Sequence, residues 1–133
     1  MVAITWFKVA AGAVGAGITW LLGGWDGLVA CLAIFMIFDF ATGLICGVIQ
    51  KNLSSEIGWR GIGRKMVMLI VLGVAVLVDR LIGQDVLRDL VCYFYIANEG
   101  ISILENAGKI GVPLPDKLMD VLKQLGGGKK SSE

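Results

Sequence analysis

Five polar side chains that could carry charge or hold water gather in the apolar segment YIANEGISILENAGKIGVPLP, from Tyr95 to Pro115. On a helix with about 100° per residue they fall within an arc of about 120°. They are Asn98, Glu99, Ser102, Glu105 and Asn106. A charge in hydrocarbon is expensive, roughly 3 to 17 kcal/mol for a basic group. We therefore expect this stripe to face protein or water. For Glu105 and Asn106, a position at the solvated end of the helix is an equally good interpretation.

A further carboxylate, Asp39, stands in another apolar run, IFMIFDFATGLICG. Thr42 and Gly43 follow it by three and four residues, which places all three on one small, polar helix face. Gly43 and Gly47 form a GxxxG pair, a spacing that lets two membrane helices approach closely. The face predicts contact with protein or water around Asp39 and helix packing at the two glycines.

No catalytic constellation accompanies these carboxylates. The chain has no histidine, no phosphate-binding loop and no nucleophile motif. Asp39 and Asp79 could be paired as in an intramembrane aspartic protease, but no surrounding motif supports this, and Asp79 is grouped with the polar residues of the membrane spans. The three cysteines lack metal or redox spacing. We expect no enzyme, no metal and no cofactor.

The elements that position these residues are predicted to be membrane helices. Hydrophobic residues make up 56% of the 133-residue chain, and a span needs about 20 of them in sequence. Four stretches qualify in whole or in part, at about 2–22, 28–49, 66–82 and 86–104. The first is rich in glycine and alanine, so three or four spans remain open. The prediction is an all-α, multi-pass membrane domain over residues 1–108.

Charges between and after these stretches predict the orientation. The predicted loop of residues 50–65 carries four basic residues against Glu56. They are Lys51, Arg60, Arg64 and Lys65. The C-terminal segment is also rich in lysine, and basic segments stay on the cytoplasmic side. We expect both segments, and therefore the C-terminus, to be cytoplasmic. The net charge of +1 and the lack of a basic stripe exclude nucleic acid as an expected partner.

Residues 109–133 are expected to form a separate cytoplasmic segment. The stretch LPDKLMDVLKQL repeats its apolar residues at helical spacing, with Pro115 suited to its first turn and Gly126 directly after it. This predicts a short amphipathic helix that lies on the membrane or packs against a partner helix. The final GGGKKSSE predicts a flexible basic tail.

Five stretches, in order along the chain, resemble the toxin-secretion and phage-lysis holins. They are DFATG (39–43), SSEIGWRGIGRK (54–65), VDRLIG (78–83), NEGISILEN (98–106) and GVPLP (111–115). The resemblance implies a small protein of the bacterial host's cytoplasmic membrane that accumulates, forms homo-oligomers and opens lesions. Through these lesions an endolysin, or in some relatives a large toxin, is released. The functional partner would then be the endolysin or toxin, with or without direct contact.

A physical account of the polar residues accompanies this resemblance. A bundle of three or four short helices is too small to enclose a wide hole, so many copies must assemble. Polar faces that pair in a closed assembly could face water in an open one, and a carboxylate would bias the balance between these states. Two other classes stay open: an ion or proton pathway with Asp39 and Glu99 as relay sites, and a non-lytic scaffold or holin antagonist.

Overall fold

The computed structural model describes residues 1–127, and these residues form five α-helices and no strand. The helices are α1 (Val2–Leu21), α2 (Gly27–Ile49), α3 (Ser55–Ile82), α4 (Val86–Lys109) and α5 (Asp116–Leu125). The all-α fold predicted from the sequence is confirmed. Most of the predicted basic tail, residues 128–133 with Lys129 and Lys130, lies outside the described residues.

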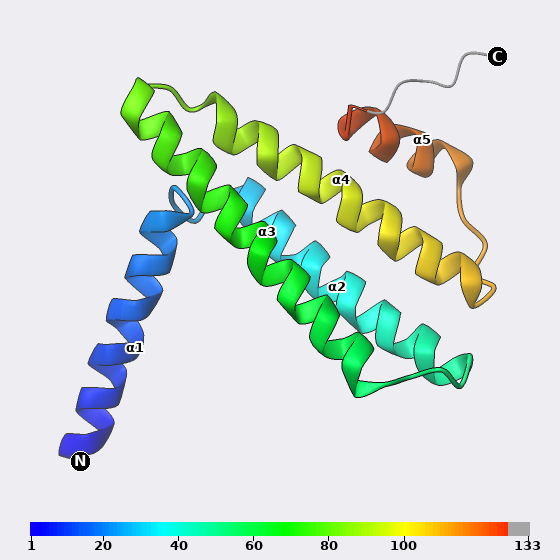
Figure 1. The fold of residues 1–133 in the computed structure, drawn as a ribbon, viewed down its shortest axis with the longest axis horizontal. Helices are drawn as coiled ribbons and strands as arrows, with labels where there is room; N and C mark the ends of the chain where they lie inside the picture. The colour runs from blue at the N-terminus through cyan, green and yellow to red at the C-terminus, as the bar shows by residue number, and fades with distance from the viewer. Residues whose placement is uncertain (128–133) are drawn as a thin grey trace.

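Helices α2, α3 and α4 form an antiparallel three-helix bundle, with α4 packed against both others (Figure 1). Their common core contains one fully buried side chain from each helix, namely Leu32, Leu72 and Cys92. Because the chain reverses twice, the end of α2, the start of α3 and the end of α4 lie at the same end of the bundle (Figure 1). Residues distant in sequence can therefore meet there.

The N-terminal helix α1 leaves this bundle at an angle, and its N-terminus lies far from the other helices (Figure 1). None of its residues is buried. Its C-terminal end contacts α3, where a methyl group on Gly73 would come within 3.1 Å of Leu21 Cγ. Helix α1 is thus attached to the bundle at its C-terminal end only.

Polar side chains cap the N-termini of three of the helices. Asp26 accepts a hydrogen bond from Val29 N at 3.0 Å, and Ser54 accepts one from Ile57 N at 3.2 Å. Both are ordinary N-caps that satisfy backbone donors in the first turn. Helix α4 has no cap from its own N-cap residue. Asp79, in the last turn of α3, supplies it instead.

The predicted loop of residues 50–65 is wrong over most of its length, because α3 begins at Ser55. Lys51 lies in the connection, whereas Arg60, Arg64 and Lys65 are helical residues of α3. The Ser54 cap and an i,i+4 ion pair from Arg60 to Glu56, at 2.9 Å, favour helix in a segment whose glycines disfavour it. Lys65 adds contacts to two other helices, described below.

Two helices, α1 and α2, are long and apolar enough to cross a membrane by length and composition. They correspond to the predicted stretches 2–22 and 28–49. Membrane crossing by α3 and α4, over residues 66–82 and 86–104, remains a prediction. Helix α5 forms where the amphipathic pattern predicts it, and it packs on α4 of its own chain.

Candidate functional site

Three charged side chains from three helices meet inside the bundle. Lys65 of α3 lies between Asp39 of α2 and Glu99 of α4, with Nζ–O distances of 2.6 Å and 2.5 Å. The Glu99 side chain is 4% exposed, and the other two are no more than 17% exposed. This ion triad joins α2, α3 and α4, and its two carboxylates and one ammonium carry a net charge of −1.

An amide and a hydroxyl extend the triad toward the end of the bundle. Asn106 Nδ2 donates to Thr42 Oγ1 at 3.0 Å and lies 3.4 Å from Asp39 Oδ1. Thr42 Oγ1 in turn donates to the Phe38 carbonyl at 2.8 Å. Asp39 is the single charged residue of α2, and these contacts give it partners on both neighbouring helices. These polar atoms therefore satisfy one another's hydrogen bonds within the bundle.

The predicted polar stripe of α4 is divided by the structure. Glu99 is buried, and Ser102 and Asn106 are half-buried beside it. Asn98 is half-buried on a different side, near Arg64, and Glu105 is exposed. The structure thus brings three of the five stripe residues to the triad.

A cavity of about 290 Å³ opens beside the triad, between α2, α3 and α4. Lys65, Glu99 and Ser102 form part of its wall, and Arg64 and Lys109 add positive charge. Four glycines also line it and keep it open: Gly43, Gly47, Gly58 and Gly61. The site is therefore a polar cleft at the end of the bundle where the basic residues gather.

The two glycines of the GxxxG pair face their own chain. A methyl group on Gly43 would lie 3.8 Å from Asn106 Nδ2, and one on Gly47 would lie 3.2 Å from Leu53 Cδ1. The small residues bring α4 and the α2–α3 connection close to α2. Their role in packing between copies stays a prediction.

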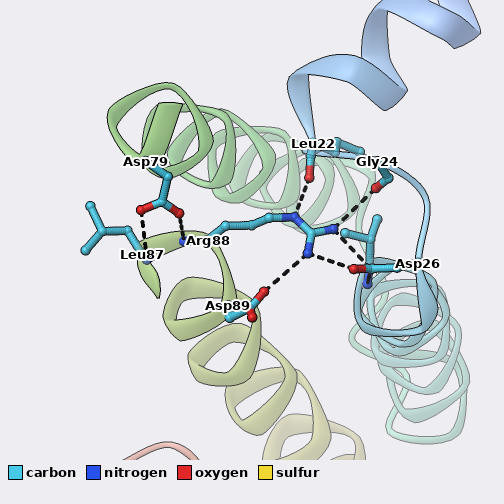
Figure 2. A network of polar contacts seen from close by, with 8 residues as sticks. Leu22, Gly24, Asp26, Asp79, Leu87, Arg88 and Asp89 are labelled. Atoms are coloured by element: carbon cyan, nitrogen blue, oxygen red, sulfur yellow. Dashed lines mark hydrogen bonds and ion pairs between the residues drawn. The ribbon is translucent and has the colours of Figure 1, made fainter. Parts of the chain in front are cut away.

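A second polar cluster, at the opposite end of the bundle, is built on Arg88 (Figure 2). Its guanidinium donates to the carbonyls of Leu22 and Gly24 and to both carboxylate oxygens of Asp26, at 2.8 to 3.3 Å. Asp89 accepts a further bond at 3.2 Å. Arg88 is 8% exposed, and its hydrogen bonds connect the α1–α2 turn to the start of α4.

Asp79 belongs to this second cluster and not to the ion triad. Its carboxylate accepts hydrogen bonds from Leu87 N at 3.0 Å and Arg88 N at 2.8 Å, and the residue is 3% exposed (Figure 2). It caps α4 from the last turn of α3. Contacts within one chain therefore explain why this carboxylate is buried. The structure separates Asp79 from Asp39, which removes the geometric basis for pairing them.

The carboxylate of Asp26, which Arg88 binds, predicts an acid response at the α1–α2 turn. The Arg88 guanidinium, together with Val29 N, lowers the pKa of Asp26 to about 2 from 3.8. Since the folded-state pKa is lowered, this contribution to stability is complete above pH 4 and is lost as the pH falls toward 2. We expect the hydrogen-exchange protection of residues 22–26, relative to the unfolded chain at the same pH, to fall over that window. Asp26→Asn should remove this pH dependence. An unchanged acid response in the variant would contradict the assignment.

Sequence reasoning placed Lys65 in a loop and assigned no role to Arg88. Lys65 was expected in a cytoplasmic loop, yet it pairs with both buried carboxylates. A signal was present: a single charge in a long apolar helix requires a partner of opposite charge at a similar depth. Lys65 is the last charge before the apolar part of α3 and meets that requirement.

Residues 16–127 match the bacteriophage holin family. An uncharacterised 14.9 kDa protein of Clostridium perfringens is 48% identical over 124 residues, covering 92% of this chain and 94% of its own. A probable holin of Bacillus phage phi105 is 39% identical over 92 residues, covering 68% of each chain. No solved structure matches. With a family match over most of its length and these relatives, the chain belongs to the bacteriophage holin family.

Proposed function

We propose that this chain is a holin that accumulates and self-associates in the bacterial cytoplasmic membrane and opens lesions that release an endolysin. Its resemblance to toxin-secretion holins adds an alternative cargo, a toxin that would leave through the same lesions. One observation supports a membrane assembly most directly. The ion triad of Asp39, Lys65 and Glu99 is enclosed by helices whose outer surfaces expose large apolar side chains.

The triad suits a protein with a closed and an open arrangement. In one chain its charges are paired across three helices, so none faces lipid. A single bundle is too small to surround a wide hole, and many copies would have to rearrange around water. Water can replace the partners of a charged group in the open arrangement, whereas lipid cannot. The charges are therefore tolerated in both states, paired with one another in the closed state and solvated by water in the open one.

Co-expression in bacteria tests the proposal. The chain is expressed with and without an endolysin, and culture density and viability are followed. We expect viability to fall abruptly at a set time, with lysis only when the endolysin is present. Gradual leakage of protons or ions without endolysin release would indicate the ion-pathway alternative. The absence of any effect would indicate the scaffold or antagonist.

The proposed orientation places residues 50–65 and the segment after Gly108 in the cytoplasm. Single cysteines at Asn52 and at Lys117, in a chain with the native cysteines replaced, should resist impermeant thiol reagents in intact cells before lysis. Permeabilised cells provide the control for reactivity. Labelling of either cysteine from outside would contradict this orientation.

Neutralising one carboxylate of the triad should delay lysis. In Asp39→Asn or Glu99→Gln, Lys65 keeps one carboxylate partner and the site loses its net charge of −1. The closed state then keeps an ion pair, while the open state loses a charged group that water solvates well and becomes less stable relative to the closed one. We expect later onset at equal protein accumulation, with the exposed Glu56→Gln as the matched control. Onset equal to the parent's in both variants would show that the carboxylates have only a local structural role.

A further inference from the structure

Arg64 lies where two hollows of the bundle meet. It lines the polar cleft of about 290 Å³ described above, and it also lines a groove of about 390 Å³ between α3 and α4. The rest of the groove wall consists of Val67 and Met68 of α3 with Tyr95 and Asn98 of α4. Arg64 is exposed, and it forms no ion pair within the part of the chain that the structure describes. A cation thus stands between a polar hollow and a mainly apolar one.

The charges around the polar cleft suit a ligand with a single negative charge. The cleft wall carries three basic residues, Arg64, Lys65 and Lys109, against the carboxylates of Asp39 and Glu99, which leaves one positive charge in excess. Lys65 is engaged by both carboxylates, so the exposed Arg64 and Lys109 are the cations that can meet a ligand. A guanidinium binds the oxygens of a phosphate group in a bidentate manner. A phosphodiester, with one charge, matches the excess better than a doubly charged phosphate would.

The groove supplies a surface for a hydrocarbon chain. Val67 and Met68 follow Arg64 by one turn, in the direction of the apolar part of α3, and Tyr95 lies across from them on α4. A small hydrophilic anion would leave these apolar side chains uncovered. An amphiphile with an anionic group at one end and a hydrocarbon chain beyond it covers both hollows. With Arg64 at the cytoplasmic boundary, the groove continues in the direction that acyl chains of the inner leaflet take.

We propose that the cleft and the groove together bind one anionic phospholipid of the cytoplasmic leaflet. Its phosphodiester meets Arg64, its headgroup enters the cleft on the side of Lys109, and one acyl chain follows the groove along Val67 and Tyr95. An apolar helix of a second copy would instead place Arg64 against hydrocarbon, which is unfavourable. The inference rests on the proposed cytoplasmic position of residues 50–65 and is independent of lesion formation.

Native mass spectrometry of the full chain in a neutral detergent tests the class of ligand. Three probes are titrated: phosphatidylglycerol, phosphatidylcholine with the same acyl chains, and glycerol 3-phosphate, which has the anionic group without the chains. We expect phosphatidylglycerol to bind about tenfold more tightly than either of the others. Equal binding of phosphatidylcholine would show that the headgroup charge is not recognised. Equal binding of glycerol 3-phosphate would indicate a soluble anion, and either result would overturn the inference.

A pair of matched variants tests the position of the site. Arg64→Gln should weaken phosphatidylglycerol binding about tenfold and leave phosphatidylcholine binding unchanged. The control is Arg60→Gln, one turn earlier on α3, because Arg60 is exposed and lines neither hollow. Equal losses in both variants, or no loss in Arg64→Gln, would overturn the inference. Circular dichroism in the same detergent confirms that the exposed substitutions leave the helices intact.

The lipid site and the proposed function can fail separately. Selective binding of phosphatidylglycerol by a chain that does not lyse cells with an endolysin would refute the holin and leave the lipid site in place. Normal lysis by a chain without this selectivity would refute the lipid site alone.

Discussion

Replacing Lys65 with methionine should destabilise the bundle by about 3–5 kcal/mol, the usual cost of removing one partner from a buried ion pair. Asp39 and Glu99 would remain between α2 and α4 without a cation, in side chains that are 17% and 4% exposed. We expect a lower unfolding temperature in detergent, followed by circular dichroism, and lower accumulation in cells. Methionine matches the length and apolar stem of lysine, so the lost charge dominates the change.

Two further variants identify the cause. Arg60→Met removes the cation of an ion pair whose side chains are 79% and 74% exposed, and such a pair contributes at most about 1 kcal/mol. A triple variant with Lys65→Met, Asp39→Asn and Glu99→Gln should recover much of the lost stability, because no buried charge remains unpaired. Unchanged stability in Lys65→Met would contradict the role of the triad. A triple variant as unstable as the single one would assign the effect to packing.

The sequence was informative about helices and about which residues avoid lipid. Apolar stretches and their breaks predicted α1, α2 and α4, because long apolar runs in this chain have few alternatives to the helix. Asp39 and Glu99 were expected to face protein or water, and the structure places both in the bundle. This could be anticipated because the cost of a charge in lipid depends little on the details of the fold.

The sequence was less informative about the partner of each charge. Lys65 appeared to belong to a basic loop, since counting charges between apolar stretches does not distinguish a loop from the first turns of a longer helix. Asp79 appeared similar to Asp39, since both interrupt apolar runs. One pairs with a cation from another helix and the other caps α4. These roles depend on which helix ends meet, which periodicity along one helix does not determine.

Helix α5 illustrates a related difficulty. Its amphipathic pattern predicted an apolar surface on one side and left the partner open between lipid and another helix. Docking in the structure depends on Gly100, where the missing side chain admits Leu122. A glycine within a helix signals close approach only when the approaching element is known. Both partners therefore satisfy the same pattern.

Replacing Arg88 with lysine should release the α1–α2 turn, although the positive charge is retained. The guanidinium binds the carbonyls of Leu22 and Gly24 and both oxygens of Asp26 at the same time, and an ammonium group cannot reproduce this planar arrangement. We expect a loss of roughly 2–4 kcal/mol, because buried carbonyls lose charged donors. Hydrogen exchange should accelerate at the amides of residues 22–24, which close the C-terminal turn of α1.

The matched control is Arg80→Lys, because Arg80 also contacts the end of α1. Arg80 Nη2 donates to the Trp20 carbonyl, and its guanidinium lies 3.9 Å from the Trp20 ring centroid, but the residue is exposed. We expect a smaller effect there. Exchange at Leu87 and Arg88 should be unchanged in Arg88→Lys, since their amides bind Asp79 through the backbone. Slow exchange throughout residues 22–24 in Arg88→Lys would mean that Leu21 packing on Gly73, and not the arginine, fixes α1 to the bundle.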